Sequence, residues 1–209
     1  MEDYRTIHGT ATGEYEEKKS RFIAALSFAD SEEAAVAFLE QVRAANRTAR
    51  HNVYAYRLRE GNRERYSDDG EPAKTAGTPA LEVLQHSGLT DLIVVVTRYF
   101  GGVLLGTGGL VRAYSGAVKE GIAASKIGTM RYGVRLKIYT DYNGIGRIQY
   151  ILRQNGLEAE DTVYTDQVEL TVLLAAECVP GLKKVIIEAT AAKAGIEEVE
   201  KLYFVAPDA

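Results

Sequence analysis

The last third of the chain alternates between strand-like and helix-like hydrophobic patterns. Four segments are rich in β-branched and apolar residues and are predicted to be strands: 134–140, 157–165, 168–175 and 198–205. Between the first two, residues 143–154 carry apolar side chains at helical spacing, and a second helix is expected to begin at Pro180. The order β-α-β-β-α-β predicts a ferredoxin-like domain over residues 133–209, with both helices on one face of an antiparallel sheet.

The first 132 residues follow a different pattern. Strands are predicted over 14–29, 53–58 and 89–100. Helices are predicted after an Asp30 cap, over 79–85 and over about 109–124. The continuous apolar run Ile93–Val96 is typical of a strand that is buried on both faces. We therefore expect an α+β domain over residues 1–132, followed by the ferredoxin-like domain.

Composition excludes several classes of protein. The 209 residues are 46% hydrophobic and 26% charged, which is typical of a globular chain rather than a disordered or fibrous one. The single cysteine, Cys178, cannot form an internal disulfide or a cysteine-rich zinc site. The longest apolar run, Ala34–Leu39, is far shorter than the roughly 20 residues of a membrane span, and the acidic N-terminus is unlike a signal peptide. We expect a cytoplasmic protein with no membrane association, cofactor or metal.

Charge is distributed unevenly along the chain. Residues 1–131 hold 17 basic and 17 acidic residues, whereas residues 132–209 hold 8 and 12, so the net charge of −4 belongs to the second part. A neutral first domain allows a local basic patch. The acidic second domain is a possible contact for a basic protein partner.

A glycine-rich corner is the strongest local motif. It leads from the buried strand, which ends near Arg98, into a predicted helix whose first turn carries Arg112. Its glycines are Gly101, Gly102, Gly106, Gly108 and Gly109. Glycine permits positive φ and close backbone approach, and a helix N-terminus attracts anions. The corner predicts either a phosphate site with two guanidinium groups or a tight packing turn; its spacing matches neither a Rossmann motif nor a P-loop.

An acidic turn precedes the second predicted helix. Asp68, Asp69 and Glu71 stand within the sequence Tyr66–Pro72. Three carboxylates could bind Mg²⁺ or Ca²⁺, order neighbouring arginines, or lie in a solvated loop. The spacing is not that of an EF-hand, so all three interpretations stay open.

Arginines and tyrosines are interleaved around the second predicted strand. Between residues 43 and 65, seven arginines, Arg50 among them, are offset only by Glu60 and Glu64, a local charge of +5. Tyr54 and Tyr56 lie in the strand, and His51 precedes it. Arginine with aromatic residues is suited to RNA, although arginine stems also cover apolar surface in solvated rims. His51 is either a structural residue or an acid–base group.

Three stretches together resemble a known family, the IMPACT/YigZ family in its bacterial two-domain form. They are His51–Arg57, Ser67–Pro72 and Arg98–Leu110, the last of which includes Tyr99. Tyr114 follows on the same segment, and Lys18–Phe22 is similar to the family's N-terminal motif. The resemblance implies an N-terminal domain similar to the second domain of a small-subunit ribosomal protein. It also implies a C-terminal domain similar to the last domain of elongation factor G. The eukaryotic member of the family regulates translation, so the resemblance implies a role in translation.

Three functional hypotheses follow. The first is a non-enzymatic RNA- or ribosome-associated protein that regulates translation, with RNA bound by Arg98, Arg112, the glycine corner and the arginine–tyrosine strand. The second is an enzyme or sensor for a small phosphorylated ligand, in which His51 and the acidic turn converge on the glycine corner. The third is a protein-interaction module that acts through the acidic C-terminal domain.

Overall fold

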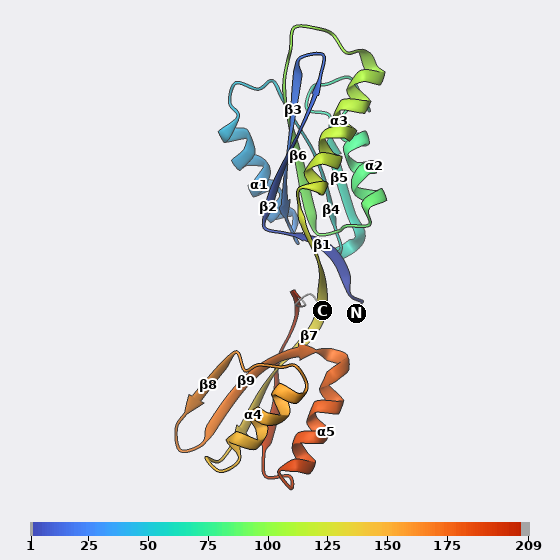
Figure 1. Ribbon diagram of the computed structural model, residues 1–209. Helices are drawn as coiled ribbons and strands as arrows, with labels where there is room; N and C mark the ends of the chain where they lie inside the picture. Colours follow the sequence, from blue (N-terminus) through green and yellow to red (C-terminus); the bar gives the residue numbers. More distant parts are fainter. Residues whose placement is uncertain (1, 206–209) are drawn as a thin grey trace. The chain divides into compact units, whose positions relative to one another are not determined.

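The computed structural model describes residues 2–205, which form two compact units. The N-terminal unit comprises residues 4–129; the C-terminal unit comprises residues 130–205 together with residues 2 and 3 (Figure 1). The strand β7 (Lys126–Thr140) runs from the first unit into the second. Its pattern predicted only residues 134–140, because residues 126–133 hold glycines and charged side chains rather than an apolar run.

The N-terminal unit is built on one antiparallel sheet. Its strand order is β2-β3-β6-β4-β5, and the central strand β6 is buried along most of its length. The bounds are β2 Thr10–Glu17, β3 Ser20–Phe28, β4 His51–Leu58, β5 Arg63–Ser67 and β6 Leu92–Tyr99. A single-turn helix, Glu60–Asn62, joins β4 to β5, and the edge strand β5 escaped prediction because its residues are mostly charged.

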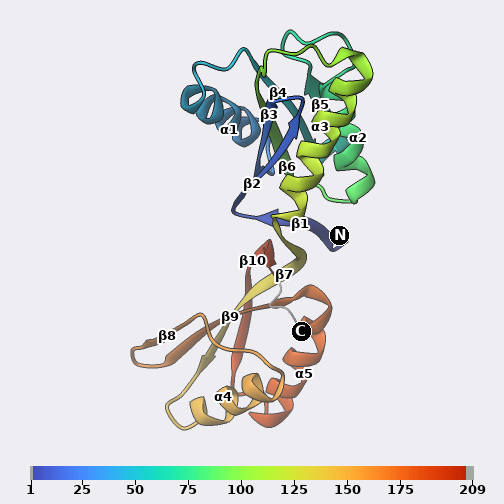
Figure 2. The ribbon, with the colours of Figure 1, turned by 45° about the horizontal axis from the view of Figure 1, so that its top comes forward.

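Helices cover both faces of this sheet. The helix α1 (Glu32–Ala45) lies on one face, and α2 (Gly77–Ser87) and α3 (Gly106–Ala123) lie on the other (Figures 1 and 2). Alternate residues of β6 enter the two cores: Val94 and Val96 pack with α2 and α3, whereas Ile93 and Val95 pack with α1. The continuous apolar run therefore marks a strand covered on both sides, as predicted. Ser31 rather than Asp30 caps α1, since its hydroxyl accepts the Ala34 N–H.

The predicted strand over residues 14–29 is wrong as a single element. It is a hairpin, in which β2 and β3 pair from Glu17–Ser20 outward and leave only Lys18 and Lys19 in the loop. Both lysines have positive φ, 47° and 66°, which a two-residue loop of type I′ requires. Asn-Gly usually marks such a turn, and its absence concealed the hairpin in the sequence. A further strand, β1 (Tyr4–His8), pairs with β7 and places His8 against Gly128.

The C-terminal unit has the predicted ferredoxin-like arrangement. Its strands follow the order β8-β9-β7-β10, and all their pairings are antiparallel. The bounds are α4 Ile145–Gln154, β8 Asp161–Tyr164, β9 Val168–Ala175, a single turn at Ala176–Cys178, α5 Val179–Ala189 and β10 Gly195–Val205. Ile148, Leu152, Leu182 and Ile186 of the two helices share one core with the sheet. The α+β fold class expected for both halves of the chain is thus confirmed.

The N-terminal unit contains a buried phenol that makes stability depend on alkaline pH. Burial, with a hydrogen bond to the Glu32 carboxylate, raises the pKa of Tyr56 from 10.0 to about 12. The folded state holds this proton more tightly than the unfolded state, so its contribution to stability is complete below pH 10 and is lost as the pH rises toward 12.

We therefore expect the unfolding free energy, measured in urea, to fall above pH 10. Tyr56→Phe should flatten this fall by at most about 1.4 kcal/mol per pH unit, the value for one proton. Tyr150→Phe, at a ring that is 59% exposed, is the matched control. An unchanged slope in Tyr56→Phe would contradict the assignment.

Candidate functional site

The sequence motifs meet at one end of the N-terminal sheet. β3 and β4 begin there and β6 ends there, because Arg21 pairs with Tyr99 and His51 pairs with Arg98. The loops at this end are the Lys18–Lys19 turn, the segment before β4, the acidic turn after β5 and the glycine corner after β6. Figure 1 shows the β2–β3 turn and the β6–α3 loop together at this end of the unit.

Asp68 organises the acidic turn. Its carboxylate accepts backbone N–H groups from Lys74 at 2.9 Å, Ala76 at 3.1 Å and Gly77 at 2.8 Å. Because Gly77 is the first residue of α2, these bonds satisfy N–H groups that the helix itself leaves unpaired. Asp68 therefore serves as a helix cap, and its oxygens are largely engaged by backbone.

Asp69 joins the acidic turn to the start of β4. Its carboxylate accepts the Asn52 N–H at 2.6 Å and an Arg43 guanidinium N–H at 3.3 Å. Its carbonyl oxygen lies 2.8 Å from His51 Nδ1. Since a carbonyl can only accept, Nδ1 carries the proton in this contact, and Nε2 of the neutral ring is then an acceptor. This carboxylate thus orders an arginine, as one interpretation of the motif expected.

Glu71 anchors a buried ionic network. Its Oε1 accepts an Arg98 N–H at 2.6 Å and the Tyr114 hydroxyl at 2.8 Å. The Arg98 and Glu71 side chains are only 9% and 4% exposed. Burial, reinforced by the Glu71 charge, raises the pKa of Tyr114 far above its usual value, so Tyr114 is a neutral donor at physiological pH. The acidic turn, the β6 strand end and α3 are thereby held together.

Aromatic rings enclose the Arg98 guanidinium. It lies 5.5 Å from the Phe22 ring centroid and 5.7 Å from that of Phe100, distances suited to cation–π attraction. Phe22 in turn meets Tyr114 edge to face at 5.0 Å. The buried Arg98 Nε has no hydrogen-bond partner among the described residues. Because Glu71 balances the charge of Arg98 and both side chains are buried, the main role of Arg98 is to hold the fold together at this end of the sheet.

A cavity of about 610 Å³ opens beside this network. Its lining combines cationic, polar and apolar side chains: Thr48, Arg50, His51, Arg98, Tyr99, Phe100 and Leu104. Leu104 is 84% exposed and Phe100 is 56% exposed, so the glycine corner presents apolar side chains to solvent. Arg50 is exposed and makes no ion pair within residues 2–205. The cavity can accept an anion together with a planar or apolar group.

Gly101 allows the β2–β3 turn to approach the glycine corner. A Cβ at this position would lie 2.0 Å from the Lys19 carbonyl carbon and 2.3 Å from the Ser20 nitrogen. The Gly101 N–H also donates to the Ser20 hydroxyl at 3.0 Å. The two loops are therefore locked together by backbone contact.

The remaining corner glycines have several roles. Gly102 and Gly106 have φ of 87° and 68°, which side chains disfavour. Gly108 and Gly109 lie in the first turn of α3, which begins at Gly106, three residues before its predicted start. Arg112 accordingly lies on the second turn, where it is exposed and does not line the cavity. Of the two arginines of the predicted phosphate site, Arg98 lines the cavity, whereas Arg112 lies beside Gly108, where an added Cβ would be 3.7 Å from its guanidinium.

The arginine-rich segment is largely neutralised within the fold. Arg57 pairs with Glu64 and also donates to the carbonyl of Leu89, while Arg63 and Arg65 pair with Glu32. Arg43 pairs with Glu40 and Asp69, and Arg59 pairs with Asp91. Arg47 and Arg50 make no such pair among the described residues.

The tyrosines of this region differ in exposure. Tyr54 stacks on Tyr56 with ring centroids 6.2 Å apart, but Tyr56 is 2% exposed and cannot meet a ligand without rearrangement. Tyr99 is half-buried and donates its hydroxyl to Asn46, at the end of α1, which shapes the cavity wall.

Sequence reasoning missed the buried polar residues that brace this site. Thr97 donates to the Asn52 side chain at 2.8 Å, and the Ser20 and Asn46 side chains hold the glycine corner and Tyr99. For Thr97 and Asn52, a lone polar residue inside an apolar strand was the available signal; Ser20 and Asn46 lie at element ends and carried none. Phe100 and Leu104 were also missed, because apolar residues beside glycines suggested packing rather than exposure.

Within residues 2–205, no helix is both long and apolar enough to cross a membrane. Nor do three His, Cys, Asp or Glu side chains in that range gather as a metal ion would require.

Comparison with known proteins accounts for both units. The Impact N-terminal domain matches residues 18–122, and a domain of unknown function (DUF1949) matches residues 138–193. IMPACT family member YvyE of Bacillus subtilis is 35% identical over 206 residues, covering 97% of this chain and 94% of its own. IMPACT family member YigZ of Escherichia coli is 46% identical over 125 residues, 58% of this chain and 61% of its own.

A solved structure agrees with these relatives. The crystal structure of a hypothetical protein, 34% identical, superimposes with a TM-score of 0.64 and covers 96% of this chain and 98% of its own. The motifs that meet at the end of the N-terminal sheet thus lie within a matched domain, and the resemblance they carry is confirmed. This chain belongs to the IMPACT family.

Proposed function

We propose that this chain is a non-enzymatic, cytoplasmic RNA-binding protein that regulates translation and contacts RNA or the ribosome through the cavity end of its N-terminal sheet. The observation that carries this proposal is the cavity itself, which is lined both by Arg50, a residue with no ion pair within residues 2–205, and by the exposed ring of Phe100. RNA offers phosphate to the first and an unstacked base to the second. The role in translation rests on the family resemblance.

Four cations lie on the loops at the cavity end of the sheet, and Arg50 among them lines the cavity. Lys18, Lys19, Arg47 and Arg50 are exposed and make no ion pair with any described residue. Of the acids at this end, Asp69 and Glu71 bind Arg43 and Arg98, whereas Glu16 and Glu17, which precede the two lysines, have no ion pair among the described residues. Glu16 and Glu17 offset Lys18 and Lys19, so the uncompensated positive charge is that of Arg47 and Arg50, which suits RNA phosphates.

A second candidate is favoured by one observation, the size of the cavity. About 610 Å³ falls within the range of small-ligand pockets. His51 and Arg50 line it, so a small phosphorylated ligand could be bound there, with His51 Nε2 as an acid–base group. The acidic turn contributes little to this chemistry, because its carboxylates hold backbone and arginine N–H groups.

The test compares RNA and ribosome co-sedimentation of the wild type with an Arg47→Ala/Arg50→Ala variant over a salt series. We expect binding to weaken by about tenfold at low salt, and the slope of log K against log salt to become shallower by about 1.4 for two lost phosphate contacts. Arg5→Ala is the matched control, because Arg5 is exposed, has no ion pair among the described residues and lies on β1, whose backbone bonds Thr90 at the opposite end of the sheet. Arg98→Ala is not used, because it would leave the buried Glu71 carboxylate without its cationic partner.

Two results would overturn the proposal. One is RNA binding that is insensitive to salt or unchanged in the Arg47→Ala/Arg50→Ala variant. The other is an absence of RNA binding at low salt combined with saturable binding of uridine 5′-monophosphate that Arg50→Ala removes. The latter result would establish the small-ligand alternative.

A further inference from the structure

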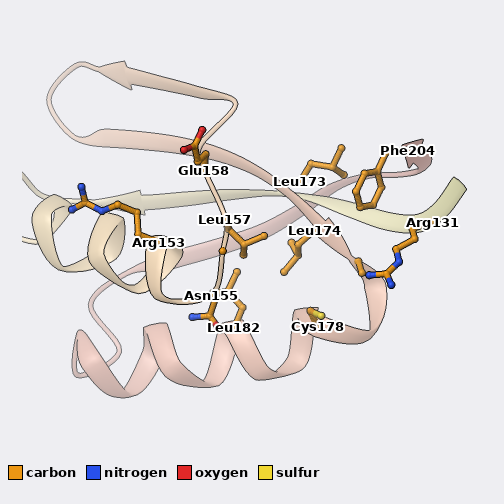
Figure 3. A pocket seen from close by; sticks show the side chains of 12 residues that line it. Arg131, Arg153, Asn155, Leu157, Glu158, Leu173, Leu174, Cys178, Leu182 and Phe204 are labelled. Carbon is orange, nitrogen blue, oxygen red and sulfur yellow. The ribbon is translucent and has the colours of Figure 1, made fainter. Parts of the chain in front are cut away.

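A second cavity lies wholly within the C-terminal unit. It encloses about 670 Å³ between the end of α4, the start of α5 and the last residues of β9. Leu157, Leu174 and Leu182 gather around it, with the Cys178 thiol beside them (Figure 3). Arg131 and Arg153 also line it and stand apart at its two sides in the same view. The RNA-binding proposal does not use this cavity.

The wall formed by β9 is an unpaired strand edge. β8 is only four residues long, and its register with β9 ends at Asp161 opposite Thr171. The last backbone bond on that side runs from the Glu160 N–H to the Thr171 oxygen at 2.8 Å. β9 continues to Ala175, so its final residues have no neighbour where β8 has stopped.

The backbone groups of Leu173 and Ala175 face this gap. Strand residues alternate in the direction of their N–H and C=O groups, so Leu173 and Ala175 point to the same side as Thr171. On that side, no backbone hydrogen bond from the described residues reaches Leu173 or the Ala175 N–H, whereas the Ala175 carbonyl, at the N-cap of the Ala176–Cys178 turn, accepts the first hydrogen bond of that turn. Both residues line the cavity. The cavity therefore combines an apolar floor with backbone groups of β9 that have no strand partner among the described residues.

We propose that this cavity binds an extended peptide segment of a partner protein, which adds as a strand beside Leu173–Ala175 and places an apolar side chain among Leu157, Leu174 and Leu182. Backbone ladder groups are satisfied best by another backbone, and an adjoining apolar pocket selects alternate side chains of the added strand. A small apolar molecule would fill the floor but leave the ladder unpaired.

The charges around the cavity define the peptide further. Arg153 makes no ion pair with a described residue, whereas Arg131 pairs with Asp3 at 3.5 Å. Glu158 also lines the cavity. On the sheet face away from the helices, ion pairs neutralise the charges of Arg135 and Lys137: Arg135 pairs with Glu160 and Glu200, and Lys137 pairs with Glu169. An apolar segment with an acidic residue positioned to meet Arg153 is therefore the expected ligand.

The test begins with selection of a displayed library of random short peptides against the full chain. We expect enriched sequences with apolar residues at alternate positions. Binding of a selected peptide should slow hydrogen exchange at the Leu173 and Ala175 amides. It should also slow maleimide modification of Cys178, which is exposed and is the single cysteine of the chain.

Leu173→Pro provides the decisive variant. Proline removes the N–H that faces the gap, and because that N–H is not used in the pairing with β7, an edge position of this kind tolerates it. We expect peptide affinity to fall by about tenfold or more, with loss of a backbone hydrogen bond and steric exclusion of the added strand. The matched control is Val199→Pro, at the bulge of the opposite edge strand β10, which should bind the peptide normally.

Several outcomes would overturn this inference. They are failure of the library to enrich any sequence, selected peptides that bind Leu173→Pro as tightly as wild type, or amide protection confined to the N-terminal unit. Concentration-dependent dimerisation that alone protects the Leu173 amide would assign the edge to a second copy of the chain instead. If Leu173→Pro unfolds, judged by circular dichroism, amide protection and Cys178 modification of the wild type decide the question.

Discussion

Replacing Glu71 with alanine is expected to lower the free energy of unfolding by about 3–5 kcal/mol, the usual loss when one partner of a buried ion pair is removed. Arg98 would keep its charge in a site where its side chain is 9% exposed, and the Tyr114 hydroxyl would lose its acceptor. Water cannot readily replace the acceptor of Tyr114, which is fully buried, and it reaches Arg98 only from the cavity side, since that side chain is 9% exposed. Urea unfolding followed by circular dichroism measures this loss.

An exposed ion pair supplies the comparison. Glu14 accepts a hydrogen bond from Arg21 at 2.6 Å, but both side chains are about half exposed. Glu14→Ala should therefore cost no more than about 1 kcal/mol. Equal losses in Glu71→Ala and Glu14→Ala would show that the Glu71 network does not hold the N-terminal unit together.

Gly101→Ala is expected to destabilise the protein by about 1–3 kcal/mol and to weaken RNA binding at the same time. The new Cβ would lie 2.0 Å from the Lys19 carbonyl carbon, so the backbone of the glycine corner or of the β2–β3 turn must move. That movement separates Lys18 and Lys19 from Phe100, whose joint placement the proposed RNA contact requires. Urea unfolding and RNA titration at one salt concentration measure the two effects.

Gly146→Ala is the matched control for this substitution. Gly146 lies in α4, where an added Cβ meets no atom within 4 Å. Alanine should therefore stabilise the helix by about 0.4–1 kcal/mol and leave RNA binding unchanged. A Gly101→Ala variant as stable as wild type would mean that the two loops separate without cost.

The sequence predicted an element correctly where the hydrophobic pattern of its residues matched the burial that those residues have in the fold. The ferredoxin-like unit was predictable because its helices and strands each bury one face, as the Ile145–Leu152 stripe and the alternation of β9 illustrate. The β2–β3 hairpin was not, since two lysines occupy a turn that usually carries Asn-Gly. β5 and β1 were missed because neither has an apolar run of its own. Backbone pairing with β4 and with β7 holds them in the strand conformation.

The candidate site was predictable in its members but not in their partners. Family motifs pointed to His51, Glu71 and Arg98, which the structure places in neighbouring contacts. Spacing along the chain could not reveal that Glu71 neutralises Arg98. Nor could it reveal that four acids outside residues 43–65, namely Glu32, Glu40, Asp69 and Asp91, pair with arginines of that segment. Charge counted over a sequence window does not give the charge of a surface, because ion pairs join residues from distant windows.

The two lysines at the β2–β3 turn also imply a trade-off between stability and function. Lys18 and Lys19 adopt φ of 47° and 66°, a conformation that costs a residue with a side chain about 1–2 kcal/mol. A sequence optimised for stability alone would place asparagine and glycine there. Strain of this kind concentrates at working surfaces. A thermostabilised variant obtained by relieving this strain would lose the two cations of the turn whose backbone packs against Gly101.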